Sequence, residues 1–152
     1  MLEAGDLSSI TTYQAGVMQA STHRLLQKHC DAILKPYAMT KMQWLIIGSV
    51  LDAGEGGIRV TDLAEKLSTT LSYLTNAINL LESKGMLMRL SNEADSRSKM
   101  VSIDPDFAPK CPEIELTLRN ALRKSIYAQV DPQDFRTYMK VLHQLSNVDS
   151  SE

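Results

Sequence analysis

The chain has 152 residues, of which 43% are hydrophobic, so it can fold around one substantial core and is not a disordered tail. Its net charge of −2 excludes a protein that holds nucleic acid through bulk positive charge alone. No apolar run approaches the roughly 20 residues that cross a bilayer, and residues 1–6 lack the basic and apolar parts of a signal peptide. We therefore expect one cytoplasmic domain, residues 1–152.

Two helices are predicted before the centre of the chain. The first spans about residues 9–35 and stops at Pro36, which cannot continue a helix. Its apolar stripe consists of Leu26, Cys30, Ile33 and Leu34. Thr40 and Gln43 form a capping-box pattern at the start of a second helix, which ends near Asp52. Its predicted inward residues are Trp44, Ile47 and Leu51.

The stretch from Ile58 to Ile103 has the order of a helix-turn-helix followed by a two-stranded wing. Residues 58–60 are β-prone and follow two glycines, and Thr61 is the expected cap of a short helix over residues 62–66. Thr70 is the expected cap of a second helix that runs to about Lys84. Gly85 then stands where a left-handed C-terminal cap is wanted.

This second helix has an apolar face and a polar face. The apolar stripe contains Leu74, Ala77, Ile78 and Leu81. The opposite face contains Ser72, Thr75, Asn76 and Asn79, with Tyr73 at its edge. A solvated helix usually carries Glu and Lys there, whereas Asn, Ser and Thr can hydrogen-bond base edges. A partner-binding or merely solvated helix is the alternative, but the wing beside it favours DNA contact.

The wing is predicted from two strands, residues 86–90 and 99–103, joined by a turn-rich loop. Arg97, near the tip, can enter a minor groove, and Asp95 can hold its guanidinium in position. An ordinary surface ion pair is the commoner reading of such a pair in isolation. At the tip of a wing we favour a role in DNA contact.

These motifs carry a family resemblance. From about Thr40 to Ile103 the sequence resembles the MarR family of bacterial transcriptional regulators. The matching segments are Thr40-Lys41-Met42-Gln43-Trp44, Asp62-Leu63-Ala64-Glu65-Lys66-Leu67, Leu80-Leu81-Glu82-Ser83-Lys84-Gly85 and Asp95-Ser96-Arg97. The resemblance implies a dimeric winged helix on a near-palindromic operator, often released by a small ligand or by thiol oxidation. The expected fold is mainly α with a small β-wing (α+β), in which helices flank a winged-helix module at about residues 40–104.

The C-terminal third predicts two more amphipathic helices. The first begins at Pro112, and Asp131 and Pro132 supply the cap and first position of the second. Their apolar residues are Ile114, Leu118, Ala121 and Leu122, then Phe135, Tyr138, Leu142 and Leu145. The module is too compact to cover the stripes of all these helices, so we expect residues 9–35 and 112–148 to form a homodimer interface. A monomeric helical subdomain is the alternative.

Residues that carry chemistry are sparse. The histidines are His23, His29 and His143, and they lack the spacing of metal ligands, so neither a metal site nor a cofactor is expected. Cys30 and Cys111 are expected to be small buried hydrophobes. Redox sensing is the minority reading, in which Lys28 and His29 lower the pKa of Cys30. No catalytic residue is predicted, so we do not expect an enzyme.

Together these observations predict a homodimeric DNA-binding regulator, a repressor, with a recognition helix at 70–84 and a wing at 90–99. The candidate DNA-binding residues are Thr70, Ser72, Tyr73, Thr75, Asn76, Asn79, Arg89, Asp95, Arg97 and Lys99. The alternative is a winged-helix module that binds proteins without reading DNA sequence. The resemblance also implies a small apolar or aromatic effector, such as an aromatic acid, near the junction of the first, second and fifth helices.

Overall fold

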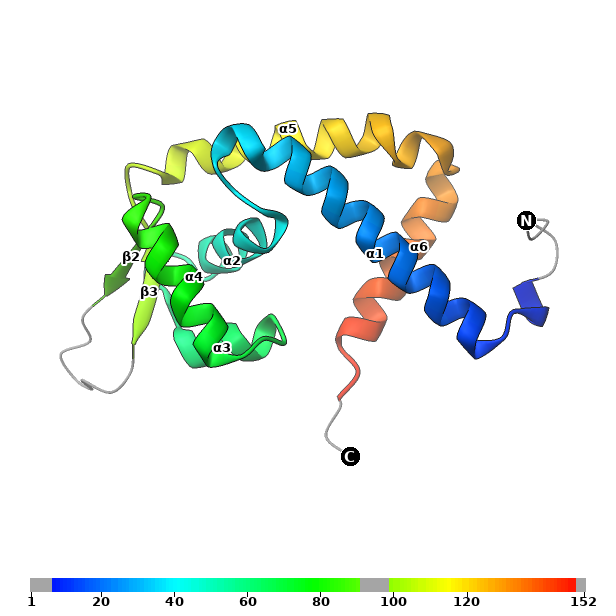
Figure 1. Cartoon of the computed structure of the whole chain (residues 1–152), viewed down its shortest axis with the longest axis horizontal. Helices are drawn as coiled ribbons and strands as arrows, with labels where there is room; N and C mark the ends of the chain where they lie inside the picture. The colour runs from blue at the N-terminus through cyan, green and yellow to red at the C-terminus, as the bar shows by residue number, and fades with distance from the viewer. Residues whose placement is uncertain (1–6, 91–98, 150–152) are drawn as a thin grey trace.

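The computed structural model describes residues 7–90 and 99–149, and most of them are helical. The elements in chain order are α1 (Thr12–Leu34), α2 (Lys41–Asp52), β1 (Ile58–Arg59), α3 (Val60–Lys66), α4 (Leu71–Ser83), β2 (Leu87–Leu90), β3 (Met100–Ile103), α5 (Cys111–Ser125) and α6 (Pro132–Ser146), with short 3-10 turns between several of them. The segment from α2 to β3 gathers at one end of the molecule, and α1, α5 and α6 extend away from it (Figure 1). The expected fold class, mainly α with a small β-wing, is confirmed.

The sheet is antiparallel and has the order β1-β3-β2. In the hairpin formed by β2 and β3, called the wing from here on, Leu87 lies opposite Ile103. β1 adds a third strand by placing Ile58 opposite Val101. This close approach requires Gly57, where an added Cβ would lie 2.5 Å from the Val101 carbonyl oxygen. The sequence predicted the β-prone run at residues 58–60, and the structure shows that it pairs with the wing.

The core is centred on the winged-helix module and is completed by the end of α1 and the start of α5. Its fully buried large side chains come from the end of α1, from α2, α3, α4, the sheet and the start of α5: Leu34, Ile46, Ile47, Leu63, Leu74, Ile78, Leu81, Leu87 and Ile114. Burial of each such side chain stabilises the fold by about 1.5–3 kcal/mol. The predicted stripe of α4 is confirmed, because Leu74, Ile78 and Leu81 are fully buried and Ala77 packs against them.

Two local expectations in the module are wrong. α3 begins at Val60, so Thr61 lies inside the helix and does not cap it. The backbone N–H of Val60 donates to the carbonyl of Lys99 at 3.0 Å, and the wing thereby satisfies a helix-start donor that a side chain would otherwise have to satisfy. Leu51 is 41% exposed, because α2 turns Ile46 and Val50 inward and its last turn passes beyond the edge of the core.

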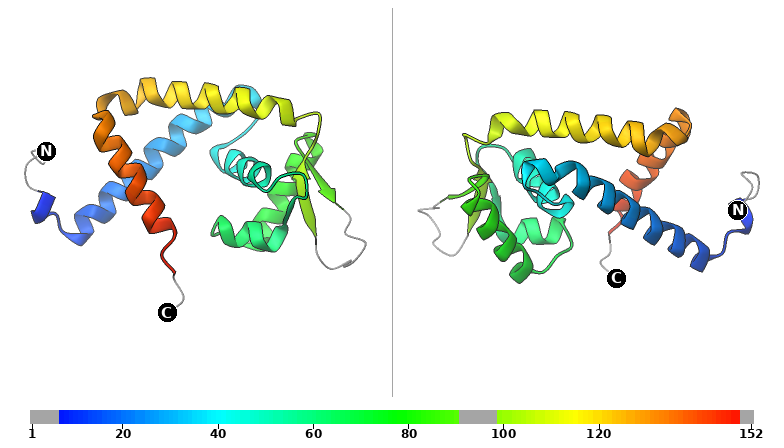
Figure 2. Two further views of the ribbon diagram at one scale, coloured as in Figure 1. Left: turned by 180° about the vertical axis from the view of Figure 1, so that it is seen from behind. Right: turned by 45° about the horizontal axis from the view of Figure 1, so that its top comes forward.

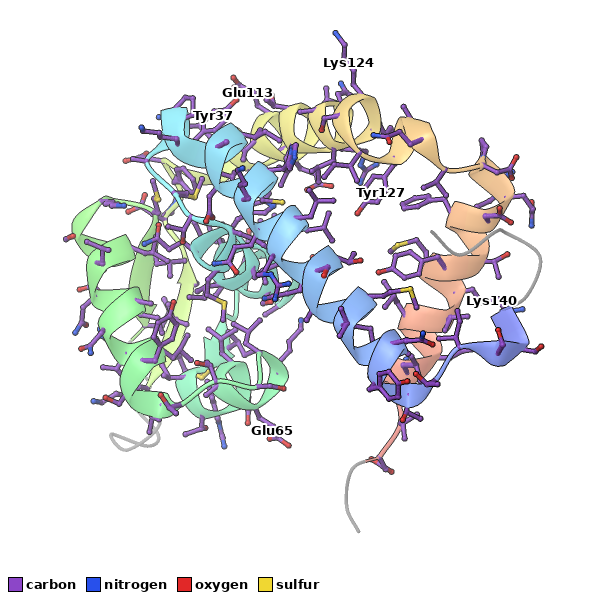
Figure 3. The ribbon with its side chains drawn as sticks, turned by 45° about the vertical axis from the view of Figure 1, so that its right-hand side comes forward. Tyr37, Glu65, Glu113, Lys124, Tyr127 and Lys140 are labelled. Atoms are coloured by element: carbon purple, nitrogen blue, oxygen red, sulfur yellow. The ribbon has the colours of Figure 1, made fainter. Side chains whose placement is uncertain are left out.

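The helices outside the module are much less covered. None of residues 12–29 of α1 is buried, and none of the residues of α6 is buried. We call residues 12–29 and α6 the arms. Both lie at the end of the molecule away from the module in each view (Figure 2). Tyr127 lies at the bend between α5 and α6 (Figure 3), where its ring contacts Phe135 with the centroids 4.4 Å apart. No helix among residues 7–90 and 99–149 is long and apolar enough to span a membrane.

Candidate nucleic-acid interface

α4 is positioned by signals at both of its ends. Thr70 caps it, with its hydroxyl accepting from the backbone N–H of Tyr73 at 3.2 Å. Gly85 follows with a φ of 73°, the left-handed conformation that ends a helix without a Cβ penalty. Because the apolar stripe anchors one side of the helix, the opposite side faces solvent. Ser72, Asn76 and Asn79 are exposed there, and Thr75 is half-buried.

Asn79 and Asn76 differ in their hydrogen bonding. The Arg89 guanidinium of β2 donates to the Asn79 side-chain oxygen, and Arg89 Nε lies 3.2 Å from a Glu82 carboxylate oxygen. This network joins the recognition helix to the wing. Asn76 makes no side-chain hydrogen bond with any residue that the structure describes. A bidentate contact with adenine needs both the oxygen and the NH2 of an Asn, and Asn76 is the residue of the two that presents both groups without such a partner among the described residues.

The outward surface of α4 also carries apolar side chains. Tyr73 and Leu71 are 47% and 49% exposed, and Leu80 is 46% exposed. Leu80 was not among the residues predicted for the interface, although its position four residues after Asn76 places it on the same half of the helix. The thymine methyl is the apolar feature of the major groove, so a mixed surface of this kind suits A·T-containing sequences.

The wing contributes basic residues beside α4. Lys99 is exposed immediately before β3, and Arg89 lies on β2, where Glu82 pairs with part of its charge. Asp95 and Arg97 lie outside the described residues, so their predicted roles stay predictions. Of the ten predicted residues, the structure therefore places seven on α4, at its cap or on β2, and an eighth, Lys99, immediately before β3.

The module is joined to the end of α1 and to the connection that follows it by polar contacts that were not predicted from the sequence. The Asp31 carboxylate of α1 accepts from the backbone N–H of Lys41 at 2.6 Å, in addition to the expected Thr40–Gln43 capping box. The Lys84 ammonium, at the end of α4, donates to the Ala38 carbonyl at 2.6 Å. Both contacts hold the recognition helix and its support in a fixed relation to the end of α1.

The cysteines lie in apolar surroundings. Cys30 and Cys111 are buried free thiols, as expected, and burial raises the pKa of each. The expected lowering of the Cys30 pKa by Lys28 and His29 is wrong: burial raises this pKa, and the smaller opposing effect comes from Lys41. A raised pKa disfavours the reactive thiolate. Among residues 7–90 and 99–149, no group of three His, Cys, Asp or Glu side chains is placed to hold a metal ion.

Comparison with known proteins identifies the module. Residues 40–99 match the model of the MarR family. Over this stretch the chain is similar to the MarR family. The stretch covers α2, α3, α4, β1 and β2 and ends just before β3. No curated protein matches the chain.

Solved structures extend the likeness to MarR-family proteins over most of the chain. AbsC, a MarR family transcriptional regulator from Streptomyces coelicolor, has a TM-score of 0.75 and 20% identity over 90% of this chain and 94% of that one. A mutant of MarR from E. coli complexed with operator DNA has a TM-score of 0.75 and 22% identity over 86% and 91%. The MepR–DNA complex of S. aureus has a TM-score of 0.71 and 18% identity over 90% and 97%. At these identities the likeness shows a shared fold.

Proposed function

We propose that this protein is a DNA-binding transcriptional regulator that reads duplex DNA with α4 and holds the adjacent groove with the wing. The observation that carries the proposal is the uncharged, hydrogen-bonding surface of α4, exposed beside a hairpin with basic residues. Asn76 is the base-reading residue, with Ser72 and Thr75 as smaller donors and acceptors. Two of the structures that share this fold are complexes with DNA.

Within this function, Thr70, Lys99 and Arg89 contact the backbone of the duplex, because hydroxyls and cations at the edges of a recognition helix meet phosphates. Tyr73 contributes apolar contact with the bases. Asn79 keeps Arg89 in place through its side-chain oxygen. The wing-tip residues Arg97 and Asp95 extend the contact into the neighbouring minor groove.

We further propose that the protein acts as a cytoplasmic homodimer and represses its target genes. The exposed apolar side chains of the arms support self-association: Tyr13, Val17, Met18, Tyr138, Met139, Val141, Leu142 and Leu145 are each at least 40% exposed. A two-fold axis through the arms presents two recognition helices to one duplex. Such a dimer requires half-sites about 34–36 Å apart, and hence a near-palindromic operator.

A mobility-shift assay with the DNA upstream of the protein's own coding sequence tests this function. Asn76→Ala should reduce the preference for the operator over a scrambled duplex by about 1–3 kcal/mol. Asn120→Ala is the matched control, because Asn120 is an exposed Asn on α5, away from α4, and it should retain wild-type preference. An unchanged preference in Asn76→Ala would contradict the assignment of the reading face.

Salt dependence provides a second test. Each phosphate neutralised by Lys or Arg contributes about −0.9 to the slope of log K against log salt. A dimer should therefore show a steep slope, and Lys99→Ala should make it shallower by about 2, one phosphate for each protomer. Lys66→Ala, which removes an exposed Lys of α3, is the control.

A protein-interaction module is the second candidate function. It is favoured by the exposed Leu71, Tyr73 and Leu80 and by the Glu82–Arg89 pair, which lowers the positive charge beside the recognition helix. If specific and scrambled duplexes bind equally weakly, and if Tyr73→Ala and Leu80→Ala abolish capture of a protein partner, this second function replaces the first.

A further inference from the structure

A cavity lies on the side of the wing next to the end of α2. Its volume is about 480 Å³, which falls in the range of small-molecule sites. Leu51 and Glu55 line it from the end of α2 and the following turn. Met88, Leu90 and Ile103 line it from the wing, and Pro105 lines it from the connection into α5. Three parts of the chain thus meet around one apolar space.

Leu51 is exposed because its side chain faces this cavity and not the core. This side chain is 41% exposed and has no place in the core, but it forms an apolar wall of the cavity together with the side chains of the wing. A ligand that fills the cavity removes this surface, along with that of Met88 and Leu90, from water. Hydrophobic contact therefore supplies the binding energy, and the thioether of Met88 suits an aromatic ring.

The charge of the residues around the cavity favours cationic over anionic ligands. Among residues 7–90 and 99–149, Glu55 is the charged residue in its lining, and none of the lining residues in these ranges is a Lys, Arg or His. In the sequence, Asp52 follows Leu51 and Asp104 lies between Ile103 and Pro105, whereas Lys110 lines a separate pocket. An anion would meet the like charge of Glu55 here, while a cation would pair with it.

We propose that this cavity binds small organic cations with an apolar body, such as aromatic quaternary ammonium compounds. The site lies next to the wing, and in Figure 1 the arms lie at the other end of the molecule. Because the ligand touches both strands of the wing and the connection into α5, it biases the position of the wing and thereby the affinity for DNA. This regulatory consequence rests on the function proposed above, but binding to the cavity does not.

Methyl NMR titration of the full-length protein with benzyltrimethylammonium tests the binding. For about 11 non-hydrogen atoms we expect a Kd on the order of 1 mM. The methyl signals of Leu51, Leu90 and Ile103 should shift, and those of Leu45 should not. Benzoate should bind roughly ten-fold more weakly than the cation, because Glu55 repels it. Equal binding of benzoate, or shifts confined to other methyl groups, would overturn the proposal.

Two pairs of variants localise the site. Leu51→Trp fills the cavity and should abolish the shifts, whereas Leu45→Trp, at a residue 43% exposed on the same helix, should leave them unchanged. Glu55→Gln should weaken the cation about two- to five-fold, because the pair is exposed to solvent, and should leave benzyl alcohol unaffected. The control is Glu65→Gln, at a carboxylate that points outward from α3 (Figure 3). Wild-type binding in Leu51→Trp with a native circular dichroism spectrum would also overturn the proposal.

A second experiment compares the affinity for operator DNA with and without the cation. A change in wild type that disappears in Leu51→Trp supports the regulatory role, and no change in wild type overturns that role. If the wild-type protein binds no DNA at all, the proposed function fails, while the NMR titration still decides whether the cavity is a cation site.

Discussion

The winged-helix module and the arms are built from helices of similar amphipathic pattern but bury their apolar residues to very different extents. In the module, Leu74, Ile78 and Leu81 of α4 are fully buried. In α6, Leu142 and Leu145 are 40% and 59% exposed. A sequence pattern specifies that a helix has an apolar side, but only the neighbouring elements determine whether that side is covered. The module is covered by its own elements together with the end of α1 and the start of α5, whereas the apolar residues of the arms stay exposed in the single chain.

Substitutions in the two regions should therefore differ most in their effect on folding. Leu81→Ala should lower the free energy of unfolding by about 2–5 kcal/mol, because it leaves a cavity in the module core. Leu145→Ala should change it by about 0.5 kcal/mol or less at protein concentrations where the chain is monomeric. Urea denaturation over a range of protein concentrations measures both values. A large loss in Leu145→Ala at every concentration would mean that the arms fold against their own chain.

A charge placed on the arms should break the dimer and leave the module folded. The double variant Leu142→Glu, Leu145→Glu should weaken self-association by at least about 30-fold, the effect of losing one strong contact at an interface. Leu45→Glu, at an exposed Leu of α2, should associate like wild type. Sedimentation velocity measures the dissociation constant. Unchanged association in the double variant would place the dimer interface elsewhere.

The contact between the two regions should have an intermediate effect on stability. Asp31→Ala removes the carboxylate that accepts from the Lys41 N–H and should cost about 0.5–2 kcal/mol, the usual range for a lost helix N-terminal acceptor. Asp31→Asn keeps an acceptor and should recover part of the loss. Asp52→Ala, which removes an exposed carboxylate at the other end of α2, is the control. Thermal unfolding at low protein concentration compares the four proteins.

The smallest expected effect is the dependence of stability on alkaline pH. Burial raises the pKa of Cys111 in the folded protein above its ordinary value of 9.0, so the folded chain holds this proton more tightly than the unfolded chain does. Its contribution to stability is fully present below about pH 9 and declines as the pH rises through the folded pKa. Cys111→Ala should make the decline shallower above pH 9. Cys30 and Tyr127, whose pKa values burial also raises, should preserve part of the slope.

Local signals were predictable from the sequence, and contacts between elements were not. The caps at Thr40, Thr70 and Asp131 and the left-handed Gly85 follow from neighbouring residues, and all four are confirmed. The prediction that Thr61 caps α3 is wrong because the Lys99 carbonyl beside the wing accepts from the first backbone N–H of α3. This contact depends on residues far apart in the chain and cannot be predicted from the local sequence.

The same limit applies to the candidate site. The polar surface of α4 was predictable, because helical periodicity alone separates it from the buried stripe. The link from Arg89 to Asn79 and Glu82 was not, because it depends on how β2 lies against α4. It separates Asn76 from Asn79, two residues that look equivalent in the sequence.

The carboxylate of Asp31 lies near one end of α1 and is bonded to the start of α2, so α1 can be regarded as a lever whose fulcrum is this contact. From this contact at Asp31 to Thr12 at the other end of α1, the lever is about 28 Å long at 1.5 Å per residue. A rotation of about 5° at the fulcrum would move its far end by about 2.5 Å, slightly less than the rise of two helical residues. A small rotation of the module would therefore produce a larger displacement of a partner chain bound at the far end of α1. By the same geometry, a partner that holds the far end in place would oppose rotation of the module strongly.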